Sequence, residues 1–278
     1  MTFTYGYSTY ALKMVDPFEA LQKIKDTGYD TLEICIREGW PTSPDVFDVD
    51  QQRKLAKLSE SLGFESPIFF GAINVCALPD DQDAMLEDAA AKFRFARELH
   101  YDDTPTLVTT TPGRIVGDWE SGKEVIRDAF LRLVDVAVEH DVVIAIEAHA
   151  GTVFEFPEKA MWMMEQTRHP NLKLDLDVSH FYVEGADVEA SVDLCAAESV
   201  MVHVKDGEMI DGVHRFSLTG DGNLDLEGFM RALKRNKIEH LPINVEVSVH
   251  QSAEPEYDPW GAAKFSLDAL VKAEKAIG

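Results

Sequence analysis

Four apolar, strand-like segments in the second half of the chain each carry an ionisable side chain near the carboxyl end. The segments are VVIAIEAH, LKLDLDVSH, SVMVHVKD and PINVEVS, and the side chains are those of Glu147, Asp177, His203 and Glu246. Burial of an unpaired charge is costly, so strand stability does not account for them. Three carboxylates and one imidazole suit Mn²⁺, Mg²⁺ or Co²⁺ better than a structural zinc ion, which usually takes thiolates. The residues therefore predict one divalent metal ion, with Mn²⁺ preferred.

The alternation of each segment places these four side chains on equivalent faces. In the first segment Glu147 and His149 share a face with Val143 and Ala145, while aliphatic residues occupy the other face. The other three segments alternate in the same way, with their aliphatic residues opposite the ionisable one. A single carboxylate at a strand end is commonly a helix cap or an ion-pair partner. Four ionisable residues at strand ends with matching alternation, three acids and one histidine, indicate side chains that converge on one point.

Strand-like and helix-like patterns alternate along the whole chain and predict a (β/α)₈ TIM barrel, an α/β fold, as a single domain over residues 1–278. Such a barrel places its active site at the carboxyl ends of the strands. A doubly wound sheet would be favoured by GxGxxG after the first strand, where the sequence reads TYGYSTYALK. The predicted strands are Phe3–Ser8, Thr31–Ile36, Phe64–Phe70, Thr106–Thr110, Val142–Glu147, Leu172–Val178, Val200–Val204 and Ile243–Val247.

The stretches between these strands have helical spacing and capping residues. Asp16-Pro17 and Gly28 bound the first helix, and Asp50 is expected to open the second, which Gly63 ends. The remaining predicted helices are 81–100, 122–140, 157–168, 187–197, 226–237 and 258–277.

The chain of 278 residues is strongly acidic, with 50 Asp and Glu against 26 Lys and Arg and a formal net charge of -24. Such a surface repels nucleic acids and anionic membranes, so neither is an expected partner. The N-terminus lacks a signal-peptide pattern, and no apolar run is long enough to span a membrane. The three cysteines form no CxxC pair. A cytoplasmic location is predicted.

The stretches IEAHAG, LDLDVSHFYVEGAD, VMVHVKDGE, LTGDGNLDLEGFMRAL and INVEVS resemble the xylose isomerase-like TIM barrel superfamily of sugar phosphate isomerases and epimerases. The resemblance implies that Glu147, Asp177, His203 and Glu246 ligate the metal. It also implies that His180 binds substrate hydroxyls or supports the ligands, and that His214 or Arg215 lies near the substrate.

The family chemistry begins with removal of a proton beside a carbonyl, which the metal polarises. In the ketose 3-epimerase branch, Glu147 and Glu246 would take the proton and return it. The Glu147-Ala148-His149 pattern is more similar to the lyase branches, such as 3-dehydroshikimate dehydratase and the C-glycoside deglycosidase subunits. There His149 would be a catalytic base, so isomerase or epimerase and lyase outcomes both stay open.

Other strand-end residues are weaker candidates. Asn74, Thr110 and Arg114 stand where polar contacts to a sugar are expected, and Lys205 shares the inward alternation, where an ion pair with Asp175 is predicted. The small-molecule partner is a sugar or related polyol, and the chain is expected to form a homo-oligomer or to serve as a heteromeric subunit. A repair nuclease like endonuclease IV would need more histidine ligands and a basic face.

Overall fold

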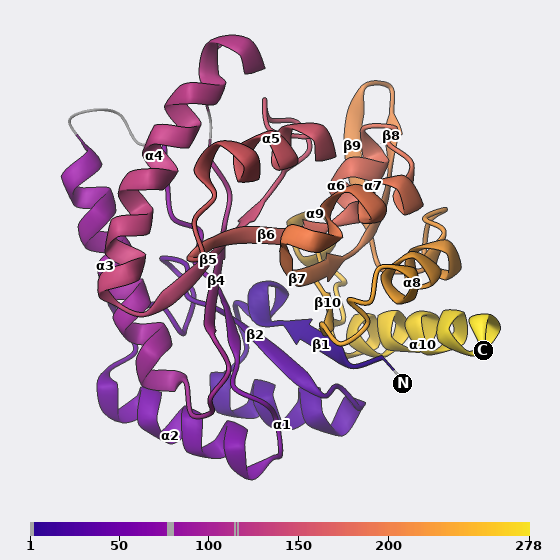
Figure 1. The fold of residues 1–278 in the computed structure, drawn as a ribbon. Coiled ribbons are helices and arrows are strands. Elements are labelled where there is room, and N and C mark those ends of the chain that lie inside the picture. The colour runs from indigo at the N-terminus through magenta and orange to yellow at the C-terminus, as the bar shows by residue number, and fades with distance from the viewer. Residues whose placement is uncertain (1–2, 77–80, 114, 116) are drawn as a thin grey trace.

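The structure is a computed structural model that describes residues 3–76, 81–113, 115 and 117–278 of the chain. Eight parallel strands close into a barrel in the order β1-β10-β7-β6-β5-β4-β3-β2, with helices between them (Figure 1). The prediction of a single-domain (β/α)₈ TIM barrel is confirmed. The proposed bounds of that domain, residues 1–278, remain a prediction, and Arg114 lies outside the described residues.

The barrel strands match the eight predicted segments closely. Two strands are clearly shorter than predicted: β3 begins at Ile68, directly after Pro67, which has no N–H for strand pairing, and β10 ends at Val245. The strands are β1 (Tyr5–Ser8), β2 (Thr31–Cys35), β3 (Ile68–Phe70), β4 (Thr106–Thr110), β5 (Val142–Glu147), β6 (Leu172–Asp177), β7 (Ser199–Val204) and β10 (Ile243–Val245).

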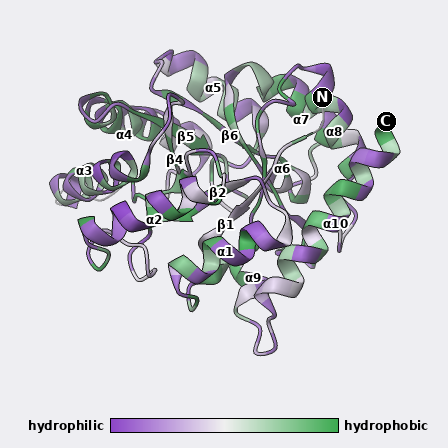
Figure 2. Cartoon of the chain, turned by 90° about the horizontal axis from the view of Figure 1, so that it is seen from below, coloured by the Kyte–Doolittle hydropathy of each residue, from purple (hydrophilic) through white to green (hydrophobic). Residues whose placement is uncertain are grey.

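Helices form an outer ring around the strands, and the apolar core lies between the two layers (Figure 2). No helix in the described part of the chain has the length and apolarity needed to cross a membrane. The α-helices are α1 (Pro17–Thr27), α2 (Val49–Ser61), α3 (Gln82–Leu99), α4 (Trp119–Glu139), α5 (Pro157–Thr167), α6 (Val178–Val183), α7 (Val188–Cys195), α8 (Leu226–Arg235), α9 (Val249–Ser252) and α10 (Pro259–Ile277). Short 3₁₀ helices cover Thr9–Leu12 and Ala196–Glu198.

Helix capping follows the sequence with one change. The Asp16 carboxylate accepts hydrogen bonds from the first turn of α1, and Gly28 ends that helix with a φ of 112°. The prediction that Asp50 opens α2 is wrong, because Asp48 caps this helix in a reciprocal pair with Gln51. A capping box satisfies two orphan N–H groups at once, so the earlier aspartate is the more favourable cap.

Three elements near the barrel mouth were not expected from the sequence. They are the short helices α6 and α9, and a hairpin formed by β8 (Asp206–Ile210) and β9 (Val213–Ser217). Asp211 and Gly212 form the hairpin turn with φ values of 51° and 76°. An Asp-Gly pair between two short strands is typical of a type I′ turn, so the sequence did carry this signal. Only Lys205 separates the end of β7 from this hairpin, which therefore belongs to the wall of the barrel mouth.

The strand register places the predicted metal ligands on the inner side of the barrel. Asp177 pairs with His203, and His203 pairs with Asn244, two residues before Glu246. Glu147 pairs with Asp175 and shares its inward orientation. Alternation along each strand therefore brings all four ligands to the carboxyl-terminal layer of the interior.

Asp206 holds the start of the hairpin to the loop before α8. Its carboxylate accepts hydrogen bonds from the backbone N–H groups of Gly207, Gly222 and Leu224, and the side chain is 1% exposed. A Cβ on Gly222 would lie 2.3 Å from this carboxylate, so the close approach requires glycine there. The Gly-Asp-Gly turn is thus fastened to the start of β8, which follows the strand that carries His203.

We predict that Asp206→Ala lowers the free energy of unfolding by about 2–4 kcal/mol, because three N–H groups, two of them buried, lose their acceptor. Urea denaturation followed by circular dichroism measures the change. Asp225→Ala is the matched control in the same loop. It removes only an exposed helix cap and should cost about 1 kcal/mol. Equal losses in the two variants would contradict the assigned role of Asp206.

Candidate metal centre and active site

The four predicted ligands meet at the barrel mouth. One ligand atom from each of Glu147, Asp177, His203 and Glu246 lies within 4.8 Å of the others, and all four side chains are buried. Glu147 and Asp177 are the last residues of β5 and β6, His203 lies in β7, and Glu246 follows β10. Strand geometry alone therefore assembles a compact set of three carboxylates and one imidazole.

Two further acids, which the sequence interpretation did not include as site residues, flank His203. Glu33 Oε1 lies 3.0 Å from His203 Nε2, and Asp175 Oδ2 lies 3.1 Å from His203 Nδ1. Both carboxylates are almost fully buried. Glu33 is an acid within the apolar strand TLEIC, which is the same signal that identified the four ligands. A carboxylate beside a ligating histidine orients the ring and raises its basicity.

The predicted ion pair between Lys205 and Asp175 is wrong. The Lys205 ammonium contacts Asp177 Oδ2 and lies 3.0 Å from Glu246 Oε2, whereas Asp175 accepts a hydrogen bond from Thr109. Lys205 stands two residues beyond His203, which pairs with Asp177, so its side chain reaches the layer of Asp177. Asp175 lies one layer deeper.

The centre holds more negative than positive charge. Five carboxylates with exposures of 0–7% contact the single imidazole of His203 or the single ammonium of Lys205. Ionisation of all five without further positive charge is unfavourable, and burial accordingly raises the pKa of Asp175 well above its usual range. A divalent cation would complete the charge balance. The five residues are Glu33, Glu147, Asp175, Asp177 and Glu246.

The electrostatic environment gives these carboxylates different pKa values. Burial raises the pKa of Glu147 to about 7, and the nearby Lys205 only partly offsets that effect. Burial also acts to raise the pKa values of Asp177 and Glu246, but the adjacent Lys205 outweighs it and holds both below their usual range. Of these three, Glu147 is thus the one whose charge is least compensated by the protein. A cation bound at its oxygen would favour the ionised form.

Unpaired atoms support the fit of a metal ion to this set. Glu147 Oε1 and His203 Nδ1 are buried and make no well-aligned hydrogen bond among the described residues, although His180 Nε2 lies 3.4 Å from the first atom and Asp175 Oδ2 lies 3.1 Å from the second. Both atoms face the other ligands. His203 Nδ1 lies 4.0 Å from Glu147 Oε1 and 3.6 Å from Glu246 Oε2. Buried polar atoms are normally satisfied, so these two are available as metal ligands.

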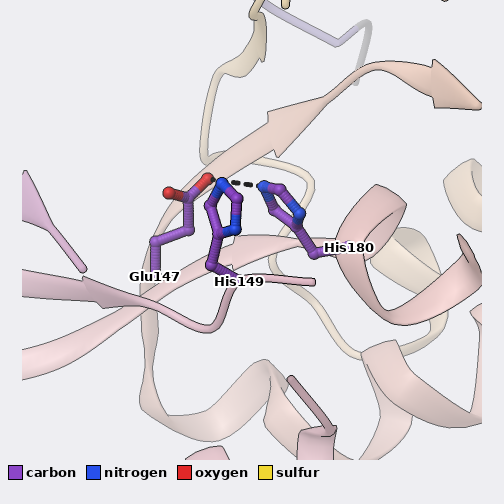
Figure 3. A group of neighbouring side chains, drawn as sticks. All are labelled: Glu147, His149 and His180. Atoms are coloured by element: carbon purple, nitrogen blue, oxygen red, sulfur yellow. Dashed lines mark ion pairs between the residues drawn. The ribbon is translucent and has the colours of Figure 1, made fainter. Parts of the chain in front are cut away.

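A second cluster lies directly beside the first and contains Glu147, His149 and His180 (Figure 3). The two imidazole rings have centroids 3.9 Å apart, and His180 Nε2 lies 3.4 Å from Glu147 Oε1. His149 follows β5 and His180 lies in α6, so the end of one strand and the helix after the next form this cluster.

The peptide groups of Ala150 fix the two histidines in opposite tautomers. The Ala150 carbonyl can only accept, so His149 donates to it from a protonated Nδ1 at 2.9 Å. The Ala150 N–H can only donate, so His180 receives it on an unprotonated Nδ1 at 3.2 Å. In their neutral forms His149 therefore has a free lone pair on Nε2, whereas His180 presents Nε2–H toward Glu147.

Both rings are held in the neutral form. Burial lowers the pKa of His180 to about 3, and the Lys205 charge adds to that effect. Burial and the neighbouring His180 also lower the pKa of His149. A neutral His149 with an open Nε2 can accept a proton, and His180 can donate a hydrogen bond to a carboxylate.

The β8–β9 hairpin forms one wall of the mouth. Phe216 packs edge-on against His180, with ring centroids 5.0 Å apart, and its backbone N–H donates to His250 Nδ1. His214 Nε2 lies 2.8 Å from Glu184 Oε1, which also accepts a hydrogen bond from the Gly151 N–H. His214 is therefore placed at the rim of the mouth. Arg215 lies on the other face of β9, is exposed and pairs in register with Glu208, so the structure does not bring it to the ligand set.

The opposite wall contains aromatic and cationic side chains. Tyr10 stacks on Trp40 and meets Phe70 edge-on, with centroid distances of 5.3 and 5.1 Å. Arg37 lies over the Trp40 ring, 5.0 Å from its centroid. Asn74 is exposed in the loop after β3 and close to Gly113 in the next loop. Thr110 is instead used structurally, since its hydroxyl exchanges hydrogen bonds with the Ile73 backbone.

The model of the family described as xylose isomerase-like TIM barrel matches residues 21–270. The chain belongs to this family. Among curated proteins no match is found. The resemblance inferred from the strand-end motifs is thus confirmed.

Solved structures share the fold of this xylose isomerase-like chain at low identity. A xylose isomerase-like TIM barrel/4-hydroxyphenylpyruvate dioxygenase fusion protein is 20% identical with a TM-score of 0.80, and the match covers 100% of this chain but 43% of the fusion protein. The probable 3-DHS dehydratase of petrobactin synthesis from Bacillus anthracis is 13% identical, with coverage of 96% and 98% and a TM-score of 0.78. D-psicose 3-epimerase from Clostridium cellulolyticum is 15% identical, with coverage of 100% and 99% and a TM-score of 0.77.

We predict that ¹⁵N NMR of the histidine rings finds His149 protonated at Nδ1 and His180 protonated at Nε2 near neutral pH, because the Ala150 backbone imposes these forms. Long-range ¹H–¹⁵N correlation spectra distinguish the two tautomers. The variants His149→Gln and His180→Gln assign the signals by removing them one at a time. Detection of the same tautomer on both rings would contradict the assigned hydrogen bonds.

Proposed function

We propose that this chain is a divalent-metal-dependent isomerase or epimerase that acts on a keto-sugar or related polyol. The observation that carries the proposal is the convergence of four buried ligand groups, two with unpaired atoms, at the mouth of a xylose isomerase-like barrel. Glu147, Asp177, His203 and Glu246 would hold one ion, with Mn²⁺ preferred and Mg²⁺ or Co²⁺ as alternatives, because the set is rich in oxygen. The ion would polarise a substrate carbonyl and acidify the adjacent C–H group.

Glu147 and Glu246 are the proposed acid–base residues. Each carries a second carboxylate oxygen in addition to the one that faces the other ligands. One of them would remove the proton beside the carbonyl to give an enediolate, and the other would return a proton. Return to the opposite face of the same carbon epimerises the sugar, and return to the neighbouring carbon isomerises it. The His180 Nε2–H would orient the Glu147 carboxylate during these transfers.

The walls of the mouth suit a polyol. Tyr10, Trp40 and Phe216 offer aromatic faces and edges, while His214 and Asn74 place polar groups at the rim. Aromatic surface with a few polar groups is typical of pockets for small organic substrates. Similar folds occur in proteins named as sugar epimerases, including the D-psicose 3-epimerase, which supports a keto-sugar as the substrate class.

A lyase of the same family is the second candidate, and the tautomer of His149 favours it. The free Nε2 of a neutral His149, next to Glu147, makes this ring a competent base. After proton removal, departure of a group from the carbon beside the enolate would give an unsaturated product. The fold similarity to the probable 3-DHS dehydratase agrees with this alternative. Proton removal next to a carbonyl is common to both candidates.

A sugar or polyol is therefore the proposed partner of the mouth. The formal charge of -24 argues against nucleic acids and anionic membranes as partners. Assembly as a homo-oligomer or within a heteromeric enzyme, and a cytoplasmic location, remain predictions from the sequence.

The proposal predicts solvent deuterium beside the carbonyl of a turned-over substrate. Chelator-treated protein, reloaded with Mn²⁺, is incubated in D₂O with ketohexoses, inososes, dehydroshikimate and 3-keto-glycosides, and products are read by NMR and mass spectrometry. Activity should fall at least about 100-fold without metal. Full activity of the metal-free protein would end the metal-dependent proposal, and turnover without deuterium would exclude the enediolate.

Replacement of His149 separates the two candidate reactions. In an isomerase or epimerase that relies on the two glutamates, His149→Ala should retain kcat within about tenfold. In a lyase that uses this ring as its base, the same variant should lose about 100- to 10,000-fold. The comparison uses the substrate found in the panel. His250→Ala is the control, because it removes an imidazole that contacts Phe216 in the hairpin wall of the mouth. A large loss in both variants would point to disruption of the wall and not to a base.

A further inference from the structure

The ammonium of Lys205 lies against the metal-ligand set itself. It contacts Asp177 Oδ2, lies 3.0 Å from Glu246 Oε2 and 3.9 Å from Glu147 Oε1. These three oxygens belong to three of the four proposed metal ligands. A cation built into the protein therefore already contacts most of the carboxylates that a divalent ion would use.

The position of this ammonium is unusual for a lysine. Lys205 is 2% exposed, and lysine is seldom buried without paired anions. Its ion pairs are made with metal-ligand oxygens, whereas the nearby Asp175 has His203 and Thr109 as partners. Among the described residues, the ammonium thus forms ion pairs only with the carboxylates proposed as metal ligands.

The backbone of Lys205 is fixed while its side chain can change direction. The Ser179 hydroxyl accepts a hydrogen bond from the Lys205 N–H at 2.8 Å and donates one to its carbonyl oxygen at 2.7 Å. The long methylene arm is not restrained by these bonds. In its present position the ammonium already lies 5.4 Å from the centroid of the Phe216 ring, so this favourable contact could be kept or shortened when Nζ moves away from the carboxylates. Movement of the arm therefore requires no change in β7.

We propose that Lys205 is an internal counter-cation of the metal site, which holds Asp177 and Glu246 in place in the metal-free protein and gives up these oxygens when the ion binds. The inference rests on the proposed metal-dependent function. It adds that the two cations compete for the same carboxylates. Lys205 would then limit the affinity for the metal while keeping the empty site folded.

Competition and simple support predict opposite effects of removing the ammonium. If Lys205 competes with the ion, its loss strengthens metal binding, because the carboxylates no longer have to break ion pairs and one repelling charge is gone. If Lys205 only positions the ligands from outside, its loss weakens metal binding, as loss of a group that orients ligands does. The sign of the change in affinity therefore decides between the two roles.

The test measures Mn²⁺ binding by isothermal titration calorimetry on the chelator-treated full chain. Lys205→Met is expected to bind Mn²⁺ about tenfold more tightly, or better, than the unchanged protein. Lys205→Arg keeps the charge and should stay near the original affinity. Lys173→Met is the matched control. Lys173 also has the inward alternation, but it lies at the start of β6, at the other end of this strand from Asp177, and forms an ion pair with Glu198.

Thermal unfolding provides a readout that does not depend on activity. Metal-free Lys205→Met should melt at a lower temperature than the unchanged protein, because its buried carboxylates have lost their counter-charge. Saturating Mn²⁺ should narrow this difference. Lys173→Met should show no such dependence on metal.

Unchanged or weaker Mn²⁺ binding by Lys205→Met would overturn the inference while leaving the metal-dependent function intact. Binding by Lys205→Met but not by the unchanged protein would support the competition and overturn the proposed function of the native chain. No binding by any variant would overturn both.

Discussion

The structure depends on the compensation of negative charge at the centre of the barrel. Eight strands close into a barrel, and five buried carboxylates point into its interior and mouth. Each needs a positive or hydrogen-bonding partner, and His203, Lys205, Thr109, His180 and the Ser179 N–H are among those that the described residues supply. The remaining excess of negative charge makes a divalent cation the natural final component of the interior.

This requirement explains why the site was partly visible in the sequence. An acid in an apolar strand is costly unless it is used, so the four ligands and their common orientation could be predicted from alternation alone. Glu33 carries the same signal but stands in the first half of the chain, where the family-like motifs are weaker. The partner of Lys205 could not be predicted in the same way. Strand alternation gives the face of a residue but not its height in the barrel, and the Lys205 ammonium lies in the layer of Asp177, above that of Asp175.

The elements around the mouth were the least predictable part of the fold. All eight barrel strands could be located because each is a distinct apolar run, whereas α6 and α9 are too short to show a helical period. The hairpin had a local signal in Asp211-Gly212, but its importance comes from Phe216, which reaches His180 only after the chain has folded back. The tautomers of His149 and His180 depend on the backbone of a third residue, which side-chain patterns do not report.

The arrangement at Ala150 has a consequence for how this barrel could acquire new reactions. The protonation pattern of the two imidazoles is determined by main-chain atoms of Ala150, whose buried methyl group packs with Val183 and Phe216 and so helps to hold this loop in place. A displacement of the loop between β5 and α5 would free either ring to adopt the other tautomer. The ring that accepts a proton and the ring that donates one could then exchange roles without substitution of an acid–base residue. Alignments that compare residue types would register no change in such a pair of enzymes.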